Sequence, residues 1–230
     1  MGAKPGGMKP STVARGLGSV SRRTRARLVH GLKEKGIRNL EVLAAVGNVP
    51  RHRFVDEALA SRAYEDIPLP IGYQQTISQP FIVALMSEKL IAGSAGRKTV
   101  LEVGTGCGYQ TAILAHLYDW VCSIERIHPL FERAENTLAT LQVDNVELRY
   151  GDGYEGWKGR SNFDSILLTA APEHIPPTIL AQLAPDGCLV APVGKVTDQR
   201  LRIVSNKGGR LYEEEAEAVR FVPLVRGIRE

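Results

Sequence analysis

Three glycines at alternate positions, Gly104, Gly106 and Gly108, form the motif with the clearest chemical meaning. They follow a short apolar run at residues 99–103 and precede a helical pattern, so we expect them in a turn from a strand to a helix. Glycines in such a turn permit a sharp bend and let a ligand lie against the main chain. Because the spacing is GxGxG rather than the GxGxxG of nicotinamide-binding proteins, it favours a cofactor without a pyrophosphate.

Two acidic residues stand where neighbouring strands should end. Glu125 closes a second apolar run at residues 120–125, and Asp152 follows a third at residues 146–150. In a parallel sheet these ends share the rim where ligands bind, so the Glu125 carboxylate is expected to accept hydrogen bonds from ribose hydroxyls and Asp152 to reach a purine. Together with the glycines, they predict an adenosyl cofactor, most simply S-adenosyl-L-methionine, with S-adenosyl-L-homocysteine as its product.

The elements that must position these residues alternate along the chain. Strands are expected at residues 99–103, 120–125, 146–150, 163–169 and 188–193, with helices at 109–118, 129–141 and 177–183 between them. This alternation is typical of a doubly wound, Rossmann-like α/β sheet, mostly parallel. Alternating residues at 199–205 and a turn at 206–209 predict an antiparallel hairpin at the C-terminal edge. Helices at 21–35 and 81–91 form an N-terminal extension.

Composition and charge limit the classes of protein that fit. The chain has 230 residues, 43% hydrophobic and 23% charged, so it is expected to be globular. No apolar run reaches the roughly 18 residues of a membrane helix, no secretory signal is expected, and three cysteines without CxxC spacing favour the cytoplasm. The five histidines lack metal-ligand spacing, so no metal site is expected.

The first 38 residues are strongly basic, with ten Lys and Arg against one acid. They contain no aromatic residue to stack on a base, so nucleic acid is not the expected partner. We divide the chain into a flexible basic leader at 1–20 and one domain at 21–230. That domain comprises a helical part at 21–98 with a substrate and cofactor loop at 71–80, a cofactor-binding core at 99–193 and C-terminal strands at 194–230.

The chain resembles the protein-L-isoaspartate O-methyltransferases over roughly residues 21–226. The matching segments are 49–56, 63–66, 69–72, 75–80, 101–111, 123–126, 151–153, 163–166, 169–172 and 221–224. Thr-Ile-Ser-Gln-Pro at 76–80 and Phe-Val-Pro-Leu at 221–224 are specific to the family, whereas the glycine motif is common to a wider class of methyltransferases. The family often has Ser where Cys107 stands.

The resemblance implies methylation of the free carboxylate of L-isoaspartyl residues in aged proteins, followed by succinimide formation and repair. It places Ser78 beside the transferred methyl group as the catalytic residue, and it places the strand around Phe221 and Val222 against the peptide backbone. The expected cofactor-binding residues are Thr76, Ser78, Glu102, Gly104, Thr105, Gly106, Gly108, Glu125, Asp152 and Gly153. The expected substrate-binding residues are Ile77, Pro80, Phe221 and Val222.

The chemistry requires little beyond alignment. A carboxylate with a pKa near ~4 is already ionised at neutral pH and needs no base, so no catalytic triad is expected. Ser78 is expected to orient the carboxylate by a hydrogen bond, although Ser78 and Thr76 could also cap the helix that begins at Pro80.

We expect the protein to be a monomer whose partners are damaged proteins, and we expect no membrane partner. The alternatives are a methyltransferase acting on RNA or a small molecule, and a non-catalytic module that binds an adenosyl ligand.

Overall fold

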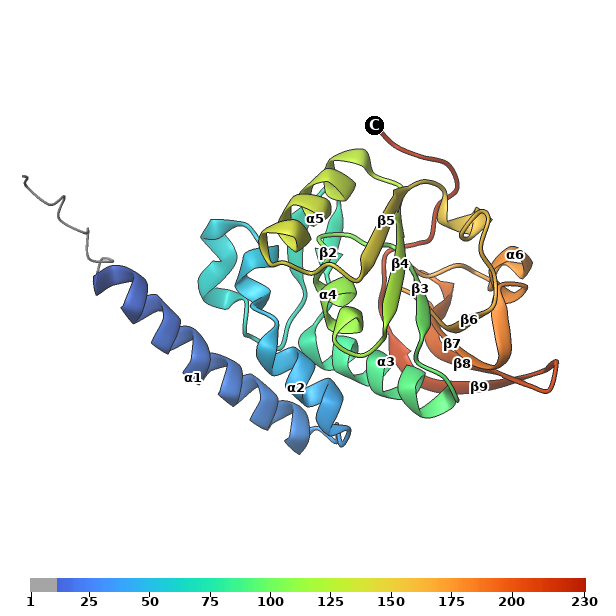
Figure 1. The fold of residues 1–230 in the computed structure, drawn as a ribbon, viewed down its shortest axis with the longest axis horizontal. Helices are drawn as coiled ribbons and strands as arrows, with labels where there is room; N and C mark the ends of the chain where they lie inside the picture. The colour runs from blue at the N-terminus through green and yellow to red at the C-terminus, as the bar shows by residue number, and fades with distance from the viewer. Residues whose placement is uncertain (1–11) are drawn as a thin grey trace, which may run out of the picture.

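The structure is a computed structural model that describes the backbone of residues 12–230 and the side chains of residues 22–230. Its centre is a seven-stranded sheet in the order β5-β4-β3-β6-β7-β8-β9 (Figure 1). The strands are β3 (Thr99–Val103), β4 (Trp120–Glu125), β5 (Val146–Tyr150), β6 (Phe163–Leu168), β7 (Leu183–Lys195), β8 (Asp198–Lys207) and β9 (Arg210–Val219). Strands β3 to β7 pair in parallel, and β8 and β9 continue the sheet antiparallel, which confirms the predicted fold class.

The central strands are buried on both faces because each side chain contributes to one of two cores. In β3, Val100 belongs to one core and Leu101 to the other, and both are fully buried. Leu167 of β6 likewise packs on the side of Val100, while Ile166 packs on the side of Leu101. Parallel sheets with both faces covered carry such continuous apolar runs. This pattern is what made the strands recognisable in the sequence.

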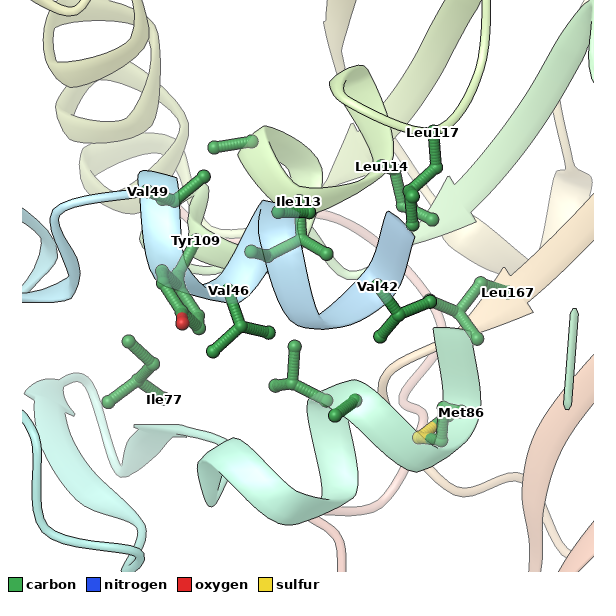
Figure 2. Close-up of a cluster of buried hydrophobic side chains, with 14 of the residues drawn as sticks. Val42, Val46, Val49, Ile77, Met86, Tyr109, Ile113, Leu114, Leu117 and Leu167 are labelled. Carbon is green, nitrogen blue, oxygen red and sulfur yellow. The ribbon is translucent and has the colours of Figure 1, made fainter. Parts of the chain in front are cut away.

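One face of the sheet carries most of the helices. These are α2 (Leu40–Asn48), α3 (Pro80–Gly93), α4 (Tyr109–Ala115) and α5 (His128–Thr140). Helix α2 packs against α3 and α4, and Figure 2 shows its Val42 and Val46 in the same buried cluster as Ile113, Met86 and Leu167. The opposite face has a thinner cover, made by α6 (Pro177–Leu180), η3 (Gly153–Glu155) and the buried Trp157.

The first helix is longer than the sequence predicts. Helix α1 spans Thr12–Glu34, whereas the apolar stripe indicates a start near residue 21. Buried Leu28 and Leu32 attach its C-terminal half to the body, and Figure 1 shows its N-terminal half extending away from the sheet. The helix therefore crosses the boundary expected at residue 20, while residues 1–11 of the expected leader lie outside the described residues.

A short hairpin lies between the N-terminal helices and the sheet. Two 3-10 turns, η1 (Arg51–Phe54) and η2 (Glu57–Arg62), lead into β1 (Leu69–Gly72) and β2 (Gln75–Ile77). Tyr73 and Gln74 join the strands with φ of 52° and 61°, the left-handed geometry of a two-residue hairpin turn. The proline-rich segment at 67–72 thus contributes the strand β1. Pro80 begins α3 as expected.

In the part of the chain that the structure describes, no helix combines the length and the apolar character needed to cross a bilayer.

Candidate active site

A cavity of about 280 Å³ opens at the carboxyl ends of β3, β4 and β6. We call it the rim cavity. The expected site residues in its wall are Thr76, Ile77, Ser78, Gly104, Thr105, Gly106, Glu125, Gly153 and Val222. They come from the β1–β2 hairpin and the residue after it, from residues 104–108 (the glycine loop), from the end of β4, from the start of η3 and from the C-terminal segment. The fold thus brings together residues that are up to 146 positions apart in the chain.

The glycine loop turns tightly against the ends of two strands. Its three glycines have φ of 102°, 57° and 88°, a left-handed conformation that side chains rarely adopt. The Gly104 N–H donates to the carbonyl of Ile124 at 2.8 Å, which ties the loop to β4. A β-carbon on Gly104 would overlap the Thr169 hydroxyl, which donates to the Gly104 carbonyl. Gly108 caps α4 and lies outside the cavity wall.

Glu125 is held rigidly beside the glycine loop. It is 5% exposed, and its carboxylate accepts hydrogen bonds from the Gly106 N–H at 2.7 Å and the Ile127 N–H at 2.9 Å. Burial raises the pKa of Glu125, while these N–H groups oppose the rise. Each oxygen retains a lone pair, so a fixed acceptor faces the rim cavity where the sequence predicts a ribose.

Glu102 lies beneath the loop and does not line the rim cavity. Its side chain is fully buried, and one oxygen meets the hydroxyls of Thr111 at 2.5 Å and Ser123 at 2.6 Å. Burial raises the pKa of Glu102 to about 8 despite these hydrogen bonds. The carboxyl group is therefore mostly neutral at pH 7. Its position suits support of the glycine loop rather than the cofactor contact that the sequence suggests.

Glu102 makes stability depend on pH. Its pKa rises from 4.5 to about 8 on folding, so its contribution is complete below pH 4.5 and is lost as the pH rises through 8. Between about pH 6 and pH 7.5, the free energy of unfolding should fall by up to about 1.4 kcal/mol per unit relative to E102Q. Urea unfolding of both proteins measures this difference. Parallel pH curves for the two would contradict the assignment.

Asp152 and Gly153 have separate roles in the structure. Gly153 lines the rim cavity, and a β-carbon there would overlap Val103. The Asp152 carboxylate instead accepts hydrogen bonds from the Tyr154 N–H at 2.8 Å and the Gly227 N–H at 2.7 Å, and Asp152 does not line the cavity. The purine contact of Asp152 stays a prediction, whereas its contact with the C-terminal segment is a feature that the sequence did not reveal.

Residues 221–230, here the C-terminal tail, cover the rim cavity. Val222, Pro223, Leu224, Val225 and Arg229 line it. Arg126 fixes the tail by two hydrogen bonds. Its Nε donates to the Gly227 carbonyl at 2.8 Å, and its main-chain carbonyl accepts from the Arg229 N–H at 2.7 Å. The Arg229 guanidinium also lies 5.9 Å from the Tyr73 ring centroid. The tail therefore reaches both the end of β4 and the hairpin turn.

A second hollow, here the side groove, adjoins the rim cavity. Thr76, Ser78, Thr169 and Val222 line both hollows. Phe221 lines only the side groove, and Pro80 lies buried outside both. A group in the rim cavity and one in the groove would thus meet at these four residues. Thr169 was not among the expected site residues, although it belongs to the segment 169–172 that resembles the family.

Some main-chain N–H and carbonyl groups of the tail already form hydrogen bonds within the protein. The Gln199 side chain accepts from the Phe221 N–H at 2.6 Å and donates to the Phe221 carbonyl at 3.1 Å. The Val222 carbonyl accepts from the Ala171 N–H at 2.8 Å. In the described residues the Val222 N–H makes no such bond. A peptide strand would therefore pair at Val222 more readily than at Phe221.

The Ser78 hydroxyl makes no hydrogen bond within the described residues. The N-cap of α3 is Gln79, and no side chain caps the helix. The alternative that Ser78 and Thr76 serve only as caps is thus unsupported. A partly buried hydroxyl without a partner, at the junction of two hollows, is available to a ligand.

Of the three cysteines, Cys107 lines the rim cavity and the other two do not. Cys107, Cys122 and Cys188 are buried free thiols, and burial raises the pKa of each. No group of three or more His, Cys, Asp or Glu suited to a metal ion occurs among the described residues.

Comparisons with known proteins agree on one family. Residues 23–229 match the family model for protein-L-isoaspartate(D-aspartate) O-methyltransferase. Curated protein-L-isoaspartate O-methyltransferases from Hahella chejuensis and Dechloromonas aromatica are each 51% identical, over 90% and 92% of this chain and 98% of each relative.

Solved structures show the same relationship. A protein-L-isoaspartate O-methyltransferase aligns with a TM-score of 0.80 and 28% identity, over 89% of this chain and 67% of that one. A Plasmodium falciparum structure, described as a putative protein-L-isoaspartate O-methyltransferase in complex with S-adenosyl-L-homocysteine, aligns with a TM-score of 0.77 and 25% identity, over 86% and 97% of the two chains. The chain belongs to the protein-L-isoaspartate(D-aspartate) O-methyltransferase family.

Proposed function

We propose that this chain transfers a methyl group from S-adenosyl-L-methionine to the free carboxylate of L-isoaspartyl residues in damaged proteins. The observation that carries the proposal is the junction of the rim cavity and the side groove at the Ser78 hydroxyl. Membership of the family makes the chain an S-adenosyl-L-methionine-dependent O-methyltransferase. The main-chain nitrogen of the following residue would then attack the methyl ester, which closes a succinimide and releases methanol, and hydrolysis of the succinimide returns some normal aspartyl residue.

The rim cavity fits an adenosyl cofactor. Glu125 offers a buried carboxylate to a ribose, and the glycine loop leaves main chain exposed where side chains would obstruct a ligand. Gly153 leaves room in the wall beside Leu224 of the tail, where the purine would lie. When bound, the sulfonium would supply an electrophilic methyl group. Its methionine end would point toward Ser78, because the side groove opens there.

The residues of the chain then have three tasks. Ser78 donates a hydrogen bond to one carboxylate oxygen of the substrate and leaves the other oxygen free to attack. Ile77 and Val222 add apolar surface beside Ser78 and help to exclude water. The C-terminal tail forms part of the wall of the rim cavity and limits the access of water to it. Alignment of this kind is worth on the order of 7–11 kcal/mol. No general base is required, because the substrate carboxylate is already ionised at neutral pH.

The replacement Ser78→Ala should lower kcat while leaving cofactor affinity unchanged. A hydrogen bond to a charged group contributes about 1.5–3 kcal/mol, so we expect a decrease of roughly 10- to 100-fold. Steady-state kinetics on an isoaspartyl peptide, with calorimetry of S-adenosyl-L-homocysteine binding, measure the two effects. Ser161→Ala, at an exposed loop position, is the matched control. Unchanged kinetics would remove Ser78 from the mechanism.

Two peptides that differ only in an isoaspartyl or an aspartyl residue test the proposal. With labelled S-adenosyl-L-methionine, we expect label in the isoaspartyl peptide and almost none in its partner. Cofactor binding without label in either peptide would instead favour a non-catalytic module or another substrate such as RNA. Label in both peptides alike would contradict recognition of the damaged residue.

Other properties follow as part of the same proposal. We propose a monomeric enzyme with no membrane or nucleic-acid partner. We place it in the cytoplasm, because its three cysteines are free and buried. Residues 21–230 would act as one methyltransferase domain in which the hairpin and the tail complete the cofactor-binding core.

A further inference from the structure

We propose that Arg220 makes the enzyme prefer isoaspartyl sites that have an acidic side chain close by in the sequence. This inference rests on the proposed function and adds a substrate preference to it. Arg220 lines the side groove and is the charged residue in its wall. The other wall residues are apolar or uncharged polar residues.

Arg220 differs from the neighbouring arginines of the same sheet edge. Arg202 forms ion pairs with Glu213 and Glu215, and Arg200 also lies near Glu215. Arg220 is exposed and has no acidic partner within 4 Å among the described residues. Glu217, the acidic residue of β9 nearest to it in sequence, does not line the groove. A free guanidinium therefore stands beside the path of a bound peptide.

The position of Arg220 suits a flanking residue rather than the reacting carboxylate. Arg220 lines the groove but not the rim cavity, whereas Ser78 lines both. It precedes Val222 by two residues, so an extended backbone places their α-carbons roughly 7 Å apart. A peptide strand paired with the tail would span that distance with about two residues, so Arg220 would lie beside a residue about two positions from the damaged one. An arginine that bonded to the attacking carboxylate oxygen would engage its lone pairs and make it a weaker nucleophile. Because Arg220 lies to the side of the reacting carboxylate, it does not interfere with the attack.

The expected preference is moderate because Arg220 is exposed. The interaction energy of one exposed ion pair corresponds to a difference of about two- to fivefold in kcat/KM between a peptide with the acidic residue and one without it. The preference should arise mainly in KM, since Arg220 does not touch the reacting atoms. It should shrink as salt is raised, because charges at the surface are screened over about 8 Å at physiological ionic strength.

Peptide series with single substitutions test this inference. Each isoaspartyl peptide carries a single Glu, Gln or Lys, placed one or two residues before or after the damaged residue. The value of kcat/KM is measured for each peptide with the native chain, R220Q and R220E. The native chain should rank Glu above Gln above Lys at the position that meets Arg220. R220Q should remove the ranking and R220E should reverse it.

Arg210→Gln is the matched control, since Arg210 is an exposed arginine at the other end of β9 and outside the groove. It should retain the native ranking. Equal rates for the three peptides with the native chain, or a ranking that survives in R220E, would overturn the proposal. Methylation of the Gln peptide by the native chain keeps this result separate from failure of the proposed function.

Discussion

Replacing Glu125 with alanine is expected to weaken binding of S-adenosyl-L-homocysteine by at least about 100-fold. Two hydrogen bonds from ribose hydroxyls to a carboxylate are lost, each with a contribution of about 1.5–3 kcal/mol. The change also frees the N–H groups of Gly106 and Ile127, which Glu125 holds at 2.7 and 2.9 Å, so the glycine loop loses a support. Calorimetric titration of native and variant protein measures the loss.

Glu125→Gln separates these contributions. The amide keeps the size of the side chain and one acceptor oxygen, so its affinity should fall between those of the native chain and the alanine variant. Glu213→Ala, which removes an exposed acid of β9, should bind as the native chain does. If Glu125→Ala retained native affinity, Glu125 would not be a cofactor ligand.

Gly104→Ala is expected to damage both stability and cofactor binding. Gly104 has φ of 102°, and its new β-carbon would overlap the Thr169 hydroxyl that bonds the Gly104 carbonyl at 2.5 Å. Left-handed strain and the clash together should cost about 3 kcal/mol or more. Thermal unfolding with and without S-adenosyl-L-homocysteine measures both effects, and stabilisation by the ligand should largely disappear.

A second substitution identifies the cause of this loss. Thr169→Ala removes the overlapping oxygen, so the double variant G104A/T169A should be less impaired than the two single changes would predict by addition. Gly31→Ala tests a glycine in α1 with open space around it, and it should leave stability nearly unchanged or higher. Native stability and binding in Gly104→Ala would contradict the role of the loop.

The sequence predicted the central sheet well because local chemistry determines it. Val100 and Leu101 lie in an apolar run that is buried on both faces of the sheet. The glycines after Val103 adopt the positive φ angles that a tight turn requires. Glu125 could be placed for the same reason, since parallel strands end at one rim. The hairpin of β8 and β9 also followed from its alternating pattern and its turn.

The tail could not be predicted as a cover for the rim cavity. Its contacts join residues such as Asp152 and Gly227, 75 positions apart, through a hydrogen bond from a main-chain N–H to a side-chain carboxylate, which leaves no pattern in the sequence. The hydrogen bonds between Gln199 and Phe221 are similarly specific to the fold. Glu102 reads as a possible ligand because it adjoins the glycines, and only the packing shows that it points to Thr111 and Ser123.

The central claim is that a donor in the rim cavity meets a substrate carboxylate in the side groove at Ser78. A crystal structure with S-adenosyl-L-homocysteine and an isoaspartyl peptide tests it directly. We expect the free carboxylate within hydrogen-bond distance of the Ser78 hydroxyl, facing the cofactor sulfur, with the ribose on Glu125. A carboxylate bound away from Ser78, or a cofactor outside the rim cavity, would contradict the account.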